Sequence, residues 1–346
     1  GDVEVIGGGG PNGFHNEAKA PAPGIVIGRS GSGIGNAWWS DRPFWPLNTG
    51  MYVTDFLGND PRFCFLWLDW IDFTSHNSGG AQPSLNRNFI YPIPLPIPPL
   101  PEQRKIADIL STWDQAIETS EALLDTARRQ KRALMQSLLT GKRRFPEFEG
   151  QEWKEVRLGD VAAVDAESLG SKTPDEFEFD YISLSNVEPG RVIGPLERLI
   201  FGEAPSRARR KVKSGDLLVS TVRPNLLGFA KVTDDYSDCI ASTGFAVVSP
   251  GSQADGSYLF HYLFSHHMKS QFHALVVGSN YPAINSTDVK KLRFSLPSVD
   301  EQKRIGQVLD DCDAEINALS DGIEILRTEK KALMQQLLTG KRRVAV

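Results

Sequence analysis

The sequence has few cysteines, no long apolar segment and no excess of positive charge. Its three cysteines, Cys64, Cys239 and Cys312, lie far apart and do not have the spacing of a zinc site. Free thiols of this kind suit a reducing compartment, and we expect a cytoplasmic protein. The apolar run at residues 65–73 is interrupted by two aspartates and is too short to span a membrane. Because the chain opens on Gly1 and not on methionine, we expect a short preceding segment.

The net charge of −5 is unlike that of many nucleic-acid-binding domains, which are basic. One segment differs, because residues 198–231 contain eight basic and two acidic residues. The local charge of a surface decides whether it attracts DNA, so the acidic total does not exclude a DNA-binding protein. Residues 1–99, in contrast, contain five basic and eight acidic residues, which leaves few side chains there for phosphate contacts.

No motif of a catalytic site is present in the sequence. The glycine-rich stretch at residues 28–35 lacks the Lys-Ser/Thr pair of a phosphate-binding loop and is predicted to be a turn. The histidines within residues 266–273 do not have the spacing of metal ligands. Neither Asn59-Asp60-Pro61 nor Pro174-Asp175 completes a methyltransferase or nuclease motif. We therefore expect a chain that is not an enzyme and has no cofactor or metal of its own.

What the sequence does contain is a long internal repeat. Residues 102–144 match residues 301–343 at a constant offset of 199, with 19 of 43 positions identical and no gap. The last twelve residues of the two copies, "ALMQSLLTGKRR" and "ALMQQLLTGKRR", differ at one position only. A register that holds over this length indicates duplication of a structural unit.

Each copy of the repeat predicts one long helix, the first over residues 102–139. Apolar or small residues recur there at alternating steps of four and three, which is the a/d pattern of a helix that packs on another helix. Ser298 and Glu301 have the spacing of a capping box, and Gly141 and Gly340 stand where C′ glycines end helices. Two such helices in one chain bury their apolar faces most simply against each other. Their Lys-Arg-Arg ends are expected to complement the helix dipole and to dock partners.

A segment rich in strand-like runs precedes each helix. In the first, the apolar run Ile25–Ile27 is followed by a helical stretch at Phe63–Trp70, and in the second Leu217–Ser220 is followed by Tyr258–Phe264. This alternation predicts two mixed α/β domains. The expected division of the chain is domain, helix, domain and helix, over residues 1–99, 100–148, 149–298 and 299–346.

Polar side chains in the loops of both domains are candidates for base recognition. Arg, Asn, Gln and Ser bind base edges in the major groove, although the same residue types are common in ordinary turns. The candidates in the first domain are Arg29, Ser30, Ser32, Asn77, Ser78, Gln82 and Arg87. The candidates in the second domain are Ser220, Arg223, Asn225, Ser279, Asn280 and Tyr281.

Together, these motifs resemble the specificity (S) subunits of type I restriction–modification systems. The residues that carry the resemblance are Pro98–Ile106, Asp300–Ile305, Trp153–Asp160, Ala81–Asn86 and the Leu-Leu-Thr-Gly-Lys-Arg-Arg that ends both predicted helices. The resemblance covers essentially the whole chain. It implies two mixed α/β target-recognition domains separated by two long conserved helices, packed as an antiparallel coiled coil with pseudo-two-fold symmetry.

The resemblance also implies a function. Such a subunit recognises a bipartite, asymmetric DNA target and directs adenine methylation or restriction by its partners, without catalysis of its own. The partners would be double-stranded DNA, two methyltransferase subunits and restriction subunits, with S-adenosylmethionine, ATP and Mg bound by those subunits. The basic residues expected to bind phosphates are Arg207, Arg209, Arg210 and Lys211. The alternative is a coiled-coil scaffold that binds only protein.

Overall fold

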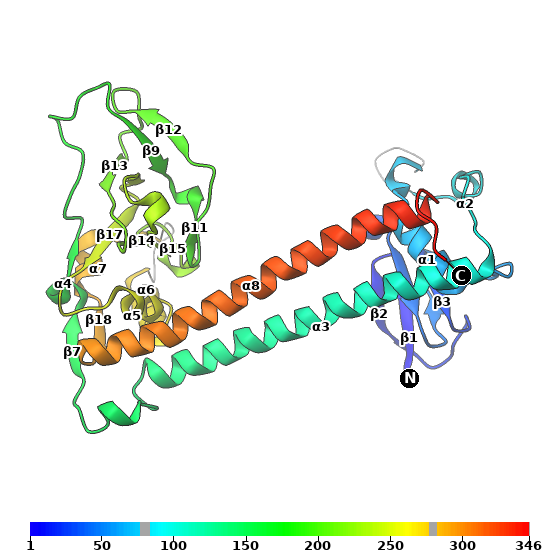
Figure 1. The fold of residues 1–346 in the computed structure, drawn as a ribbon, viewed down its shortest axis with the longest axis horizontal. Helices are drawn as coiled ribbons and strands as arrows, with labels where there is room; N and C mark the ends of the chain where they lie inside the picture. The colour runs from blue at the N-terminus through cyan, green and yellow to red at the C-terminus, as the bar shows by residue number, and fades with distance from the viewer. Residues whose placement is uncertain (77–83, 277–281, 346) are drawn as a thin grey trace. The chain divides into compact units, whose positions relative to one another are not determined.

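The computed structural model describes residues 1–76, 84–276 and 282–345. The chain divides into two compact units, Gly1–Leu123 with Leu319–Val346, and Leu124–Ala318. Each unit contains one globular domain and one part of each of two long helices, α3 (Leu100–Leu138) and α8 (Val299–Leu338) (Figure 1). The predicted mixed α/β fold with two long helices is confirmed, and both helices begin beside the segment boundaries expected from the sequence.

The described residues of the first domain form two small sheets and two α-helices. Its elements are β1 (Val3–Gly7), β2 (Gly10–His15), β3 (Gly24–Gly28), β4 (Ala37–Ser40), β5 (Trp45–Pro46), β6 (Gly50–Tyr52), α1 (Pro61–Trp70) and α2 (Arg87–Ile90). The sheets have the orders β2-β1-β5 and β4-β3-β6. Strand β3 is buried on both faces, because Val26 points into one apolar cluster and Ile25 and Ile27 point into another.

The second domain is larger, and its described residues form sixteen α-helices and strands. They are β7 (Lys154–Arg157), α4 (Leu158–Val161), β8 (Ala162–Val164), β9 (Glu178–Ile182), β10 (Val187–Glu188), β11 (Arg191–Val192), β12 (Glu197–Ile200), β13 (Ala208–Lys211), β14 (Leu217–Ser220), β15 (Phe229–Lys231), β16 (Ile240–Ser242), β17 (Phe245–Pro250), α5 (Gly256–Leu263), α6 (His266–Val276), α7 (Ser286–Lys291) and β18 (Arg293–Leu296). Its two four-stranded sheets have the orders β15-β14-β17-β8 and β12-β9-β16-β13.

The two domains share a common framework. The order β4-β3-β6 in the first domain corresponds to β15-β14-β17 in the second, and in both the outer strands pair antiparallel with the central strand. As in β3, alternate residues of β14 face opposite cores, with Leu217 and Val219 on one side and Leu218 on the other. Helix α1 corresponds to α5 and α2 to α7. The second domain differs chiefly by its additional sheet.

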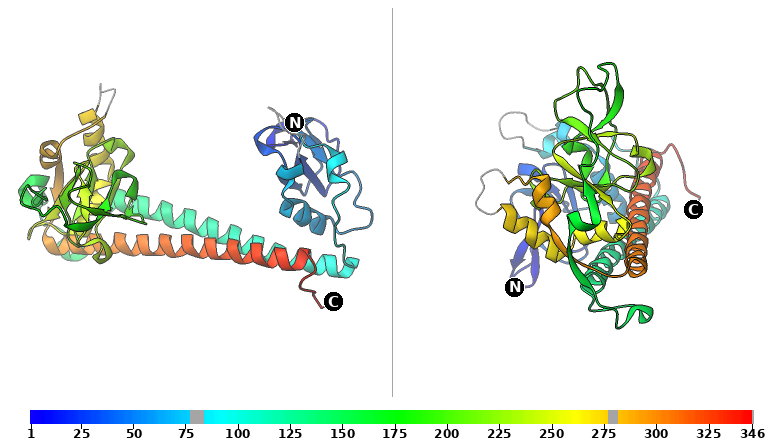
Figure 2. Two further views of the ribbon diagram at one scale, coloured as in Figure 1. Left: turned by 90° about the horizontal axis from the view of Figure 1, so that it is seen from above. Right: turned by 90° about the vertical axis from the view of Figure 1, so that its left-hand side faces the viewer.

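Helices α3 and α8 pack antiparallel in both units. In the first unit, Ile106 and Leu110 near the start of α3 lie in one buried cluster with Leu337 near the end of α8. In the second unit, Leu138 at the end of α3 lies in a cluster with Ile305 near the start of α8. In each unit the two helix segments run side by side in every view (Figures 1 and 2). The a/d pattern therefore predicted the buried seam.

A lysine interrupts the apolar seam once in each repeat, and each of these lysines forms an ion pair across the helices. Lys131 pairs with Asp313 in the second unit, and Lys330 pairs with Asp114 in the first. Both lysines and both aspartates are related by the repeat offset of 199 residues. The same polar contact is thus made twice, and it explains why the seam tolerates a charged residue.

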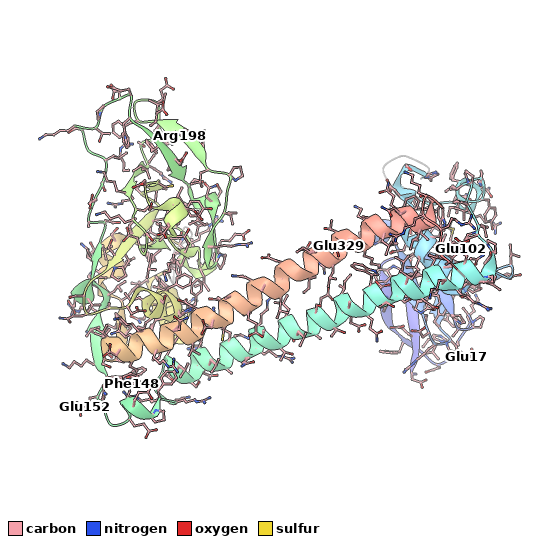
Figure 3. All side chains as sticks on the ribbon, viewed as in Figure 1. Glu17, Glu102, Phe148, Glu152, Arg198 and Glu329 are labelled. Atoms are coloured by element: carbon pink, nitrogen blue, oxygen red, sulfur yellow. The ribbon has the colours of Figure 1, made fainter. Side chains whose placement is uncertain are left out.

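The Lys-Arg-Arg motif after each helix ends in an arginine that forms an ion pair with a buried glutamate. Arg144 donates from Nε to Oε1 of Glu301 at 2.9 Å and from Nη2 to Oε2 at 2.6 Å. Glu301 is also the acceptor for the indole N–H of Trp153, at 2.9 Å. In the first unit Arg343 donates in the same two-pronged way to Glu102, which Figure 3 labels at the start of α3.

These ion pairs correct two predictions from the sequence. The last arginine of each motif is not directed at a partner or at the helix dipole, since a glutamate of the other repeat binds it. The capping box is only half formed: Ser298 accepts a hydrogen bond from the Glu301 amide at 3.4 Å, but the Glu301 carboxylate binds Arg144 and Trp153 instead of returning to the cap. Gly141 and Gly340 do have the predicted left-handed C′ conformation, with φ of 67° and 72°.

The glutamine that follows each buried glutamate fastens the domain to the helix. Gln103 accepts a hydrogen bond from the amide of Asp60, the N-cap residue of α1, at 2.9 Å. Gln302 accepts the corresponding bond from Asp255, the N-cap residue of α5, at 2.8 Å. The repeated Glu-Gln pair therefore has two structural tasks, since the glutamate joins the two helices and the glutamine joins helix to domain.

Acid should remove the contribution of the Glu102–Arg343 pair to stability. The hydrogen bond from Arg343 lowers the pKa of the Glu102 carboxyl below its ordinary value. A carboxyl with a depressed folded-state pKa stabilises the fold fully above its unfolded pKa, about 4.3 for glutamate, and this stabilisation is lost as the pH falls through the lower, folded value.

We therefore expect Glu102→Gln to lower the thermal unfolding midpoint at neutral pH, and the difference from the wild type to shrink as the pH falls below the unfolded pKa of about 4.3. Glu118→Gln is the matched control, because Glu118 is exposed on the same helix. Thermal unfolding of the three proteins across this pH range measures the effect. A difference of the same size at both ends of the range would show that the carboxylate charge is not responsible.

Candidate nucleic-acid interface

Neither a metal-binding cluster nor an activated cysteine is found among the described residues. Within residues 1–76, 84–276 and 282–345, no group of three or more His, Cys, Asp and Glu side chains could hold a metal ion. Burial raises the pKa of the Cys64 and Cys239 thiols to about 11, so both are protonated at neutral pH and are poor nucleophiles. In the same part of the chain, no helix has an apolar stretch sufficient to cross a membrane.

The loop at residues 221–227, between β14 and β15, is anchored on two sides. The amide and the hydroxyl of Thr221 both donate to the Gly244 carbonyl, each at 2.8 Å. The Arg223 amide donates to the Pro282 carbonyl at 2.7 Å. These bonds fix the backbone of the loop.

Ser220, predicted to contact DNA, is instead part of this anchoring. Its side chain is buried, and its hydroxyl donates to the Val222 carbonyl at 2.7 Å. A buried hydroxyl with this internal acceptor cannot reach a base, so the prediction for Ser220 is wrong in this conformation. The residue type suggested a polar loop contact, but position 220 is still inside β14.

Three side chains at the tip of the loop face solvent: Arg223, Asn225 and Leu226. Arg223 and Asn225 were predicted from the sequence, and neither side chain forms a hydrogen bond or ion pair with any residue in the described ranges. Leu226 was missed, although it is 62% exposed. The sequence-based search considered only polar types, whereas an exposed apolar side chain in a loop can pack on a thymine methyl group.

The backbone of the loop is left-handed at two residues that are not glycine. Arg223 has φ of 49° and Leu227 has φ of 56°. In the first domain, the corresponding positions of the loop between β3 and β4 are Gly31 and Gly35, with φ of 78° and 81°. A non-glycine residue in this region costs about 1–2 kcal/mol. The same backbone path is thus formed without strain in one domain and with strain in the other.

The first-domain loop is anchored in the same way. The Arg29 amide donates to the Thr49 carbonyl at 2.9 Å, and the Leu85 amide donates to the Arg29 carbonyl at 2.8 Å. Ser30 forms an isolated β-bridge with Ser84, as Val222 does with Ala283 in the second domain. Two loops that are distant in sequence therefore meet at one edge of each domain.

The side chains on the first-domain loop differ from those in the second. Arg29 and Ser32 are exposed, while Ser30 is half-buried. Arg87 is exposed on α2, which begins after the capping residue Asn86. The structure thus brings Arg29, Ser30 and Ser32 together on one loop, with Arg87 on a separate short helix.

Arg207 lies at the same edge of the second domain as the 221–227 loop. Its carbonyl accepts a hydrogen bond from the Thr243 amide at 2.7 Å, and the next residue, Gly244, accepts the two bonds from Thr221. The turn at 242–244 therefore separates Arg207 from the loop. Thr243 is exposed there and was not predicted, because no local pattern in the sequence indicates that this turn adjoins the 221–227 loop.

The other members of the predicted basic cluster are not a single phosphate-binding patch. The Arg209 guanidinium lies 4.6 Å from the centre of the Phe201 ring, and Arg210 forms an ion pair with Asp165 at 2.8 Å. Lys211 is exposed, but at the opposite end of β13 from Arg207. Of the four basic residues predicted to bind phosphates, Arg207 is the one beside the 221–227 loop.

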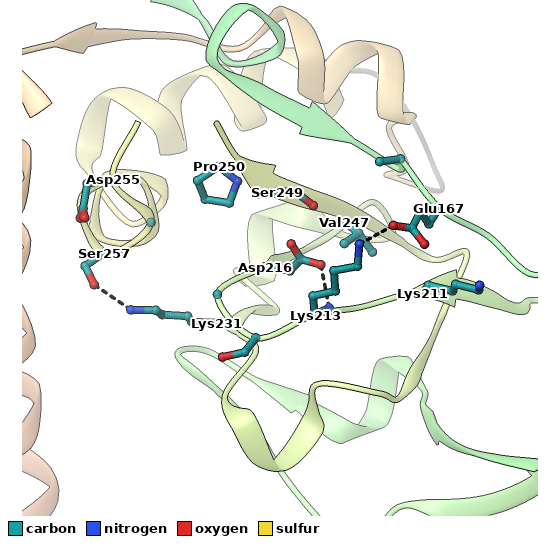
Figure 4. A pocket seen from close by; sticks show the side chains of 14 residues that line it. Glu167, Lys211, Lys213, Asp216, Lys231, Val247, Ser249, Pro250, Asp255 and Ser257 are labelled. Atoms are coloured by element: carbon teal, nitrogen blue, oxygen red, sulfur yellow. Dashed lines mark hydrogen bonds and ion pairs between the residues drawn. The ribbon is translucent and has the colours of Figure 1, made fainter. Parts of the chain in front are cut away.

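A cavity of about 500 Å³ lies at that other end of β13, beside the start of α5 (Figure 4). Its charged lining residues are Lys211, Lys213, Lys231, Glu167, Asp216 and Asp255. The charges balance, and two of the lysines already have internal partners, since Lys213 pairs with Glu167 and Lys231 contacts Ser257. We therefore place the candidate interface at the loop edge and not at this cavity.

Six further candidates lie outside the described residues: Asn77, Ser78, Gln82, Ser279, Asn280 and Tyr281. Their roles stay predictions. The structure does describe the residues that follow these candidates in the chain. Ser84 forms a β-bridge with Ser30, and the Pro282 carbonyl accepts a hydrogen bond from the Arg223 amide.

Comparison with known proteins identifies the family. The model of the type I restriction modification DNA specificity domain matches residues 1–128 and 150–326. The type I restriction enzyme MjaVIII specificity subunit of Methanocaldococcus jannaschii is 27% identical over 287 residues, which are 78% of this chain and 67% of the relative. The putative MjaX specificity subunit of the same organism is 27% identical over 288 residues, 76% of this chain and 62% of the relative. The match thus spans about two thirds of these relatives' length.

Solved structures share the fold. The S subunit of a type I restriction-modification system from M. genitalium superimposes with a TM-score of 0.63 at 16% identity, covering 98% of this chain and 89% of its own. A chain from a study of complex assembly and conformational transition in the type I R-M system gives a TM-score of 0.56 at 18% identity, covering 98% and 92%. The family model matches most of the length of this chain. The chain therefore belongs to the type I restriction modification DNA specificity domain family.

Proposed function

We propose that this chain is the DNA-recognition subunit of a type I restriction–modification complex and that each domain recognises one half of a bipartite, asymmetric target. The two halves would differ because the two domains differ in the side chains they present. The gap between the half-sites would have a constant length, because one chain carries both domains on the same two helices, α3 and α8.

One observation carries this proposal. The recognition-type loops of the two domains have the same anchoring bonds and the same left-handed positions, yet they present different exposed side chains, Arg29 and Ser32 in one and Arg223 and Asn225 in the other. A shared backbone with divergent tips is expected of two modules that perform one task on two different sequences. A protein-only scaffold would not require it, and the named relatives are specificity subunits.

Catalysis would be left to partner subunits. We propose that two methyltransferase subunits bind the chain, that restriction subunits join the full complex, and that S-adenosylmethionine, ATP and Mg are bound by those subunits. The internal repeat supports two equivalent partners, because each unit offers the same pairing of α3 with α8. The complex would act in the cytoplasm.

Selection from a randomised duplex library tests the proposal. The full chain, assembled with the modification subunits of its system, should enrich two short sequence blocks separated by a gap of fixed length and free sequence. Specific duplexes should bind roughly 10³-fold or more tightly than random ones at moderate salt. A scaffold without sequence-specific DNA binding predicts no enrichment of any block, and that result would refute the proposal.

A further inference from the structure

The second recognition loop keeps a large charged side chain at a position where the first loop has glycine. Arg223 has φ of 49° and ψ of 53°, inside the left-handed region, and its counterpart Gly31 has φ of 78°. Glycine would adopt this conformation without strain. Among the described residues of the second domain none needs a side chain here, since Arg223 is exposed and its guanidinium has no hydrogen-bond or ion-pair partner in those ranges.

The backbone that carries Arg223 is held rigidly. Its amide is bonded to the Pro282 carbonyl at 2.7 Å, and its carbonyl accepts from the Leu226 amide at 2.9 Å. The following residue, Pro224, is buried and begins a short 3-10 turn. The Cα–Cβ direction of Arg223 is therefore fixed, and only the flexible part of the side chain is left to adjust.

We infer that Arg223 is a specificity-determining residue that recognises a guanine in the half-site of the second domain. This inference rests on the function proposed above. The guanidinium can donate two parallel hydrogen bonds to O6 and N7 of guanine in the major groove, a contact that depends on a fixed origin for the side chain. Because position 31 is glycine, the first domain cannot make this contact from the same loop position, and its half-site is recognised by other side chains.

A phosphate contact would not need this geometry. Phosphates are bound by flexible side chains from many directions, and such contacts carry no sequence information. Arg207 provides the comparison for a phosphate contact. It is exposed beside the turn at residues 242–244, and its backbone is not left-handed. The two arginines are thus expected to respond differently to substitution.

The experiment compares three variants with the wild type: Arg223→Gly, Arg223→Lys and Arg207→Ala. Each protein is used as the full chain assembled with its modification subunits, and its DNA preference is measured by selection from a randomised duplex library. Arg223→Gly should fold with an unfolding midpoint at least equal to that of the wild type. It should lose discrimination at one G·C pair of one half-site by about 10- to 100-fold and keep every other position. Arg223→Lys keeps the positive charge but lacks the planar guanidinium with its two parallel donors. It should therefore lose discrimination at the same G·C pair.

Arg207→Ala should weaken binding to all sequences to a similar extent and leave the motif unchanged. If Arg223→Gly and Arg223→Lys enrich the wild-type motif, if they weaken binding uniformly, or if the relaxed position is not a G·C pair, the role of Arg223 is overturned. If the wild-type complex enriches no motif, the proposed function fails instead, so the two failures are distinguishable.

Discussion

Replacing residues 1–99 by the first recognition domain of another family member should change one half of the methylated DNA motif and leave the other half unchanged. The first domain has its own apolar clusters, around Val26 and around Ile25, so it can be exchanged without opening the core of the second. It meets the helices through α1 and through the bond between Gln103 and Asp60. A donor domain that supplies an equivalent N-cap aspartate should therefore dock on the same helices.

The expected effect is large. Each mismatched base pair costs about 1–3 kcal/mol, so a half-site of several base pairs changes binding to the old target by roughly 10³-fold or more. Methylation-sensitive sequencing of host DNA measures both halves at once. The reciprocal exchange of residues 149–298 is the control and should change the other half only. A hybrid with both halves altered would contradict independent recognition by the two domains.

Glu301→Ala should lower the free energy of unfolding by about 3 kcal/mol. The Glu301 side chain is 1% exposed and that of its partner Arg144 is 16% exposed, so the substitution leaves a largely buried guanidinium without its carboxylate. The Trp153 indole N–H loses its acceptor at the same time. Chemical denaturation of the full chain, followed by the fluorescence of its tryptophans, measures the change.

Two controls separate the ion pair from a general effect of the substitution. Glu329→Ala removes an exposed carboxylate from the same helix (Figure 3) and should change stability by no more than about 0.5 kcal/mol. In a double-mutant cycle, Arg144→Ala should cost much less in the Glu301→Ala background than in the wild type. Fully additive effects of the two substitutions would show that the pair is not coupled.

The helices could be predicted from the sequence because their determinants are local and periodic. The a/d pattern around Ile106 and Ile305 predicted which residues are buried between the helices. Gly141 predicted the end of α3 to within a few residues. The partner of Arg144 could not be predicted in this way, because Glu301 is 157 positions away in the chain and the pairing depends on the helices being antiparallel. The capping-box pattern instead predicted that the Glu301 carboxylate bonds to the N-terminus of its own helix, α8.

The candidate interface was predicted only in part, for a related reason. Residue type and loop position selected Arg223 and Asn225 as candidates for DNA contact, and both side chains are exposed. These two criteria could not show that Ser220 is buried within β14 or that Arg210 is already paired with Asp165, since burial and pairing are tertiary properties. The strain at Arg223 also has no local sequence pattern, and only the comparison of its backbone with that of Gly31 reveals it.

The most direct test of the account is methylome sequencing of a host that carries this chain together with its modification subunits. We expect one adenine-methylated motif made of two different specific blocks separated by a gap of constant length, and no such motif when the chain is deleted. A single continuous motif, or methylation that does not depend on this chain, would contradict recognition of one half-site by each domain.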